Sequence, residues 1–178
     1  MMNERSQERG EGGRIPRRGF GIRSMNILML ATAAALGTYA GSMLTEALVL
    51  VPYWQSLDPD AFHQWYAANA QRLVDYFGRV TVVAGVLVIV MSAVALARRD
   101  RRRWYWAAAA ALIAICIATF PLYFESANAS FAAAPLPAEH LASELSRWSA
   151  LHWVRTVLSI AAFGAALAAC LGESRTTQ

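Results

Sequence analysis

The sequence predicts an all-α fold, a bundle of four transmembrane helices. Of its 178 residues, 57% are hydrophobic, and the mean hydropathy of +0.34 is too high for an ordinary soluble domain. The apolar residues are gathered into four blocks, over about 25–51, 79–97, 104–124 and 150–171. Each block can cross a hydrocarbon core, which needs about 20 residues. The connections are short, so we expect one membrane domain over residues 24–172 and no sizeable soluble domain.

The distribution of arginine predicts the orientation of the bundle. The sequence contains no lysine, six arginines precede the first block, and five more lie between residues 98 and 103. Cytoplasmic loops carry the excess of basic residues. We therefore expect both termini and the 98–103 link in the cytoplasm, and a multi-pass protein of the inner (plasma) membrane. Topology accounts for these arginines, so the expected partner is the lipid bilayer and not a nucleic acid; a homo-oligomer stays open.

The first block is expected to be a retained membrane helix behind a disordered tail. Residues 1–23 are rich in Gly, Arg and Glu, a composition typical of disorder. The apolar run that follows is longer than the hydrophobic region of a signal peptide. Small residues such as Gly37 and Gly41 would let neighbouring helices approach closely. We expect Pro52 to end this helix near the outer surface.

The two outer links are predicted to contain amphipathic helical segments. Residues 59–78 alternate apolar and polar residues at helical spacing, with Asp58 or Asp60 as N-cap. This segment is either a helix at the membrane interface or an extension of the second span. Pro121 is expected to bend or end the third span. Residues 139–148 are predicted to lead into the fourth span, and residues 173–178 form a C-terminal tail.

Glu46 is the residue that most strongly suggests a functional site. It is the only acidic residue inside any of the four apolar blocks. A charged side chain at membrane depth costs roughly 2.5–3.5 kcal/mol at the centre of a span, and such residues usually have a partner or a function. The two cysteines, Cys116 and Cys170, are expected to be small buried hydrophobes, because no Cys-x-x-Cys motif is present.

The predicted topology places several other polar residues at the height of Glu46, in the outer part of the bundle. Helical spacing puts Tyr39 and Ser42 on the face of Glu46, and it puts Trp148, His152 and Arg155 on one face of the fourth span. Arg79 opens the second span and Asn128 follows the third. We expect a polar pocket in which Glu46, His152 and Arg155 are catalytic and the substrate contacts Tyr39, Ser42, Arg79, Asn128 and Trp148. The alternative is a structural ion pair between Glu46 and Arg155.

The sequence leaves the cofactor open. His63, His140, Glu125, Glu46 and His152 could together form a carboxylate–histidine metal site on the outer side. The Glu-x-x-His spacing of diiron bundles does not occur. We therefore assign no metal ligands, and a bound metal stays an alternative.

The stretch Arg147-Trp-Ser-Ala-Leu-His-Trp-Val-Arg-Thr156 leads into an alanine-rich final helix. It resembles the start of the last helix in the anthrone oxygenase-like family of small four-helix membrane proteins, where a Trp precedes an Asn-His-x-Arg-Thr type sequence. Trp148, Arg155 and Thr156 fit this pattern, whereas the histidine stands at 152 with Trp153 after it. An Asn after the third span and a Pro after the first are similar too. The resemblance implies oxidation of an anthrone to an anthraquinone with dioxygen, although many relatives have no assigned activity.

Three functions follow as hypotheses, and the sequence does not decide whether the protein is an enzyme. In the first, the protein oxidises a lipophilic aromatic molecule, with Glu46 or His152 as base and Arg155 stabilising an enolate. In the second, it is a small proton-coupled transporter that uses Glu46. In the third, it is a non-catalytic membrane subunit whose polar cluster only fixes packing.

Overall fold

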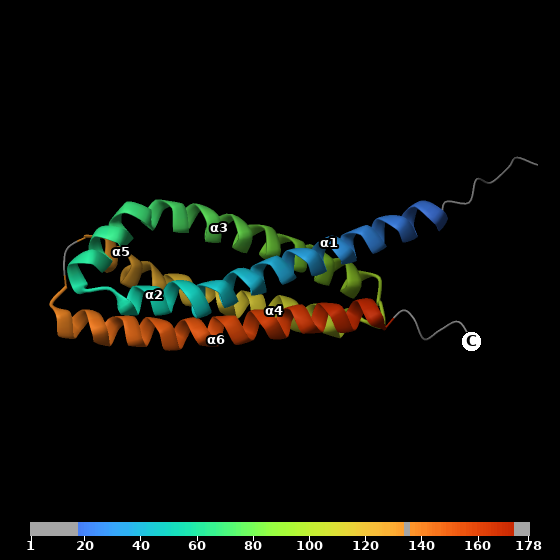
Figure 1. Ribbon diagram of the computed structural model, residues 1–178. Coiled ribbons are helices and arrows are strands. Elements are labelled where there is room, and N and C mark those ends of the chain that lie inside the picture. The colour runs from blue at the N-terminus through green and yellow to red at the C-terminus, as the bar shows by residue number, and fades with distance from the viewer. Residues whose placement is uncertain (1–17, 134–135, 173–178) are drawn as a thin grey trace, which may run out of the picture.

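The described part of the chain is a bundle of four long helical rods, as the sequence predicts. The computed structural model describes residues 18–133 and 136–172, and no strand occurs among them (Figure 1). The first rod joins α1 (Arg18–Thr45), the π-helical segment η1 (Glu46–Leu50) and α2 (Val51–Ser56), and the second is α3 (Pro59–Ala97). The third joins α4 (Arg103–Thr119), the π-helical segment η2 (Phe120–Phe124) and α5 (Glu125–Ala133), and the fourth is α6 (Ala138–Leu171). All four rods are long and apolar enough to cross a membrane.

The rods form a closed square in cross-section. The α6 helix packs against α1 and α4, and α3 packs against the same two helices from the other side. The start of α1, the end of α6 and the link from α3 to α4 lie at one end of the bundle, whereas α2 and α5 lie at the other (Figure 1). Which end faces the cytoplasm stays a prediction.

Three boundaries differ from those predicted. The first helix begins at Arg18, so residues 18–23 are helical, while the predicted disorder of residues 1–17 lies outside the described residues. Pro52 does not end the first rod, which continues to Ser56, and Pro121 does not end the third, which continues to Ala133. Each proline stands near the start of a new helical segment, where its missing N–H costs little.

The first outer link is an extension of the second span. The α3 helix runs unbroken for 39 residues from Pro59, and the side chain of Asp58 caps it by accepting from the Ala61 amide at 2.9 Å. Its first turns are held to the far side of the bundle by His63. The His63 ring makes hydrogen bonds with the Phe131 carbonyl and the Leu136 amide, both at 3.0 Å. The residues before Trp148 likewise belong to the unbroken α6 helix.

The short link from α3 to α4 is a tight turn stabilised by contacts between Arg102 and the Asp100 carboxylate. Arg99 adopts a left-handed conformation with φ 51°, and the Asp100 amide reaches back to the Ala95 carbonyl at 2.9 Å. The Arg102 side chain and amide donate to the Asp100 carboxylate at 2.8–3.0 Å. These contacts hold the pKa of Asp100 below its usual value. The turn therefore fixes how α3 and α4 meet.

Two separate clusters form the core, one towards each end. The first packs small and aliphatic residues of α1, α3, α4 and α6, including Leu36, Val88, Ile113 and Ala166. The second, which we call the aromatic cluster, consists of Val51, Trp54, Phe62, Tyr66, Phe124, Ala127, Phe131, Leu141, Leu145 and Trp148. His152 joins the two clusters, because it bonds to the carbonyl of Met43 in the first and stacks on Trp148 in the second. The polar site thus lies where two apolar cores meet.

Close packing of α1 on α6 predicts different effects at two neighbouring glycines. A Cβ at Gly37 would stand 3.1 Å from Cε2 of Phe163, whereas a Cβ at Gly41 meets no atom within 4 Å. We expect Gly37→Leu to destabilise the fold by about 1–3 kcal/mol, because overpacking forces the neighbours to move. Gly41→Leu is the matched control and should not destabilise. Thermal unfolding of both variants in lipid nanodiscs measures the difference, and equal losses of stability would contradict this account of the α1–α6 contact.

Candidate functional site

Glu46 owes its position to the local geometry around Pro52. A proline in a helix donates no backbone hydrogen bond, and its ring clashes with the carbonyl four residues earlier. Here the chain widens into a π-helical turn, in which the Val51 amide bonds to the Glu46 carbonyl. Glu46 is the first residue of that turn, and its side chain is only 6% exposed. Such single π-turns often occur at functional sites.

A second proline produces the same distortion on the other side of the bundle. Pro121 lies in η2, where the Glu125 amide bonds to the Phe120 carbonyl. Glu46, Phe120 and Pro121 all line one cavity. The two π-turns therefore face each other across it.

Glu46 is paired with His152. Its Oε2 atom lies 3.6 Å from Nδ1 of His152, and the histidine side chain is completely buried. Within residues 18–133 and 136–172, no ion pair joins Glu46 to Arg155 within 4.0 Å, so the alternative of a structural pair between these two residues is not formed. The guanidinium still lies close enough to interact electrostatically with the carboxyl.

The hydrogen bonds of His152 show which ring nitrogen is available to exchange a proton with Glu46. Its Nε2 atom lies 2.9 Å from the Met43 carbonyl oxygen. A carbonyl oxygen only accepts, so Nε2 carries a hydrogen and donates it. Nδ1 has no hydrogen-bond partner and points to the carboxyl group. The pair can therefore share one proton, which stands either on the carboxyl group facing the Nδ1 lone pair or on Nδ1 facing the carboxylate.

Neighbouring side chains fix the orientation of the His152 ring. Trp148 stacks on it with a centroid distance of 4.9 Å and an interplanar angle of 17°. The Trp148 indole donates from Nε1 to Oδ1 of Asn128 at 2.9 Å. That bond orients the Asn128 amide, so its NH₂ group stays available as a donor. Thr156 adds a hydrogen bond to the Met43 carbonyl at 3.4 Å, on the same α1–α6 contact.

Arg155 is a buried cation with unused donors. It is 8% exposed, and its Cζ atom lies 4.4 Å from the centroid of the Phe124 ring, a cation–π contact. Its Nε atom is buried without a hydrogen-bond partner. A buried arginine without a carboxylate partner is costly. An anion or a developing negative charge beside it would therefore be stabilised.

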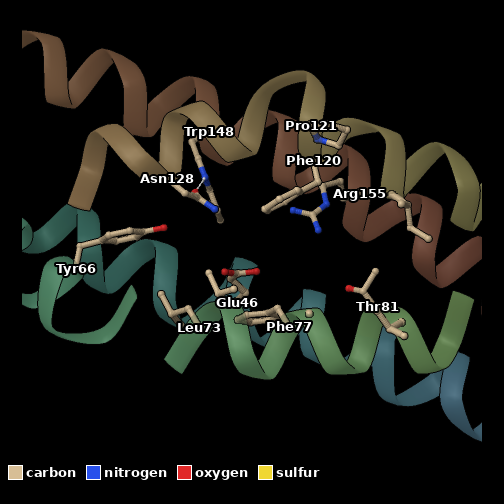
Figure 2. Close-up of a pocket in the computed structure, with 14 residues that line it drawn as sticks. Glu46, Tyr66, Leu73, Phe77, Thr81, Phe120, Pro121, Asn128, Trp148 and Arg155 are labelled. Carbon is tan, nitrogen blue, oxygen red and sulfur yellow. Dashed lines mark hydrogen bonds between the residues drawn. The ribbon is translucent and has the colours of Figure 1, made fainter. Parts of the chain in front are cut away.

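These groups line an apolar cavity of about 310 Å³ between α3 and the α4–η2–α5 rod. Figure 2 shows Glu46 and Arg155 pointing into it from opposite sides, with Asn128 and Trp148 beside them. Its lining residues are Glu46, Tyr66, Leu73, Val74, Phe77, Gly78, Thr81, Val82, Ile117, Phe120, Pro121, Asn128, Trp148 and Arg155. Val74, Val82 and Phe120 are also exposed on the outside of the bundle. In a bilayer the cavity therefore opens sideways between α3 and η2, towards the lipid.

Four of the eight predicted site residues line this cavity: Glu46, Asn128, Trp148 and Arg155. His152 lies behind Glu46 and does not reach the cavity wall, and Tyr39 is buried close to Arg155. Ser42 belongs to a different cavity, between α1 and α3. The side chain of Arg79 is 81% exposed and pairs with Asp75 at 3.8 Å, so it is not part of the site.

Sequence reasoning missed the contribution of α3. Tyr66 and Thr81 line the cavity together with Leu73 and Phe77. Tyr66 is 3% exposed, and Figure 2 shows its hydroxyl pointing towards the cavity. The available signal was the spacing of Phe62, Tyr66, Leu73 and Phe77 on one helical face. The same amphipathic pattern is also typical of a helix at the membrane interface, where Trp and Tyr are common, so the sequence left both alternatives open.

The histidine–carboxylate metal site considered from the sequence is not assembled. His63 is held by backbone groups near Phe131, and Glu46 has His152 as its neighbour. Among residues 18–133 and 136–172, no three His, Cys, Asp or Glu side chains come together as a metal-binding group.

Comparison with known proteins places the chain in a family. The family model described as anthrone oxygenase matches residues 62–165, which is more than half of the 178-residue chain. No curated protein and no solved structure matches the chain. The matched segment contains Tyr66, Asn128, Trp148, His152 and Arg155, whereas Glu46 precedes it. The chain belongs to the anthrone oxygenase family.

Proposed function

We propose that the protein is a membrane oxygenase that takes a lipophilic aromatic ketone with an acidic C–H bond, such as an anthrone, from the bilayer and oxidises it with dioxygen. One observation carries the proposal: the buried acid Glu46 and the buried cation Arg155 line one apolar cavity that opens towards lipid. A base and an oxyanion-stabilising cation are what enolate formation needs. Membership of the anthrone oxygenase family supports the same chemistry.

The cavity suits a flat, apolar substrate. Its volume of about 310 Å³ lies at the lower end of ligand pockets, which hold roughly 300–1,000 Å³. Leu73, Phe77 and Ile117 supply apolar contacts along its length. The lateral opening would admit a molecule already dissolved in the hydrocarbon region, so the substrate need not cross water.

In the first chemical step, Glu46 acts as the general base. Its carboxylate removes the proton from the carbon para to the anthrone carbonyl, across the central ring, and the electron pair of that C–H bond delocalises onto the carbonyl oxygen. Arg155 and the Asn128 NH₂ group stabilise the resulting enolate oxygen by donating hydrogen bonds. This charge is absent in the neutral ketone, so the interaction favours the transition state over the bound substrate.

In the second step, dioxygen oxidises the enolate. The carbanionic carbon bonds to dioxygen, and the peroxide receives the proton held by Glu46. Glu46 then removes the second hydrogen of that carbon as a proton, the O–O bond breaks, and the departing hydroxide takes this proton. Anthrone and dioxygen become anthraquinone and one molecule of water, with dioxygen as the only oxidant.

His152 is a positioning residue in this scheme. It touches Glu46 and not the cavity. Its Nε2 bond to the Met43 carbonyl and its stacking on Trp148 hold the ring still. Nδ1 can therefore accept a proton from Glu46 or return it without moving. His152 thereby keeps the Glu46 carboxyl group in one orientation, between the substrate and Nδ1.

Glu46→Gln should abolish most of the activity without unfolding the protein. The amide keeps the shape of the side chain but cannot accept the substrate proton, and loss of a general base lowers the rate about 10²- to 10⁴-fold. The measurement is anthraquinone formation and oxygen consumption by purified protein in nanodiscs. Asp75→Asn, a change at a carboxylate that is 51% exposed beside Arg79, is the control and should keep the wild-type rate. A wild-type rate in Glu46→Gln would remove Glu46 as the base.

Arg155→Met should lower kcat about 10²- to 10³-fold, the usual effect of losing one oxyanion donor. Methionine is similar in length to arginine, so it can still pack on the Phe124 ring, but it carries no charge and no hydrogen-bond donor. KM should change much less, because the oxyanion charge develops only in the transition state. Steady-state kinetics over a range of anthrone concentrations separate the two constants, and Arg155→Lys should recover part of kcat. If Arg155→Met raised KM alone, Arg155 would only bind the ketone.

A further inference from the structure

We infer that a second cavity between α1 and α3, bordered by hydroxyl groups and by Arg72, is a water route to Glu46, separate from the lipid-facing cavity. This cavity, which we call the α1–α3 groove, has a volume of about 540 Å³. Its lining residues are Thr38, Gly41, Ser42, Thr45, Glu46, Leu50, Trp65, Asn69, Arg72, Leu73, Tyr76 and Phe77. Glu46, Leu73 and Phe77 also line the lipid-facing cavity. Glu46 therefore stands in the wall between the two cavities.

The groove wall carries hydroxyl groups between its exposed edge and the helical turn before Glu46. Ser42 donates from Oγ to the Thr38 carbonyl at 2.8 Å, so in its contact with the Tyr76 hydroxyl, also 2.8 Å, the tyrosine donates. Tyr76 is 52% exposed, whereas Ser42 is 7% exposed and lies one helical turn before Glu46. Hydroxyls spaced in this way can pass hydrogen bonds through water from the surface to the buried acid.

The two openings differ in what they can admit. Exposed Thr38, Thr45 and Arg72 border the groove, whereas exposed Val74, Val82 and Ile117 border the lipid-facing cavity. Water and charged solutes are favoured in the first environment and strongly disfavoured in the second. On the cavity side the ionisable groups near Glu46 are Arg155 and Tyr66, and His152 lies behind Glu46, away from the cavity. On the groove side the charged group is Arg72.

The need for a water route to Glu46 rests on the proposed function. Each turnover would release one molecule of water beside Glu46. A cavity that opens into lipid offers that water no favourable exit. Access to Glu46 through the groove is nevertheless a physical property, and it can be measured without any catalytic turnover.

The test compares two glycine substitutions, one at each cavity. Gly41 lines the groove and Gly78 lines the lipid-facing cavity, and a Cβ at either position meets no atom within 4 Å. A leucine side chain can therefore fill either space without a clash. The reporter is Glu46→Cys with the two native cysteines, Cys116 and Cys170, changed to alanine, in lipid nanodiscs. The probes are a charged methanethiosulfonate and an apolar aryl maleimide.

We expect the charged reagent to modify Glu46→Cys, and the added Gly41→Leu substitution to slow that reaction at least tenfold. Gly78→Leu should leave the charged reagent unaffected and slow the apolar maleimide instead. If the charged reagent fails to react, or if Gly78→Leu and not Gly41→Leu slows it, the groove is not the route. Ser42→Cys, a nearly isosteric change in the groove wall, repeats the test should Glu46→Cys fail to fold. A protein that shows the expected labelling but no anthrone oxidation would keep the route and overturn only the proposed reaction.

Discussion

The burial of Glu46 against His152 is the constraint on which the rest of the site depends. An acid inside an apolar bundle needs a partner, and the partner is a histidine whose other nitrogen is already committed to the Met43 carbonyl. Nδ1 is therefore the only nitrogen of His152 that can share a proton with Glu46. Arg155 stands nearby without a direct ion pair to Glu46, and its Nε atom has no hydrogen-bond partner and is free for a ligand. A direct Glu46–Arg155 bond would instead have neutralised both groups and left a merely structural contact.

The fold supports this arrangement through the two π-turns. Pro52 and Pro121 each force a widened turn in a spanning helix, and these turns bring Glu46 and Phe120 to the same cavity. The aromatic cluster closes the bundle on one side of the site, and the small-residue core closes it on the other. The remaining openings are lateral: exposed valine and isoleucine side chains border one, and exposed threonine and arginine side chains border the other. A carboxyl group placed between them can meet a lipid-soluble molecule on one side and water on the other.

The sequence predicted the four spans because hydrophobic blocks of that length have few alternatives. It also predicted the face shared by Trp148, His152 and Arg155, because helical periodicity fixes which side chains align. The sequence did not predict features that depend on how two helices are placed relative to each other. It did not show that His152 is the neighbour of Glu46, that Arg79 points away from the cavity, or that Tyr66 and Thr81 form part of its wall. Pro52 and Pro121 misled for a related reason, since a proline can widen a helix as well as end it.

The proposed reaction requires that Glu46 and its neighbours generate an enolate before dioxygen reacts. Rapid anaerobic mixing of the nanodisc-bound protein with an anthrone tests this most directly, because enolate formation has its own absorbance and needs no oxidant. We expect the enolate to appear in an amount matching the protein, to persist without oxygen, and to be converted to anthraquinone when oxygen is admitted. If no enolate forms anaerobically while oxygen still yields anthraquinone, Glu46 does not act as a base that prepares the substrate, and the claim is contradicted.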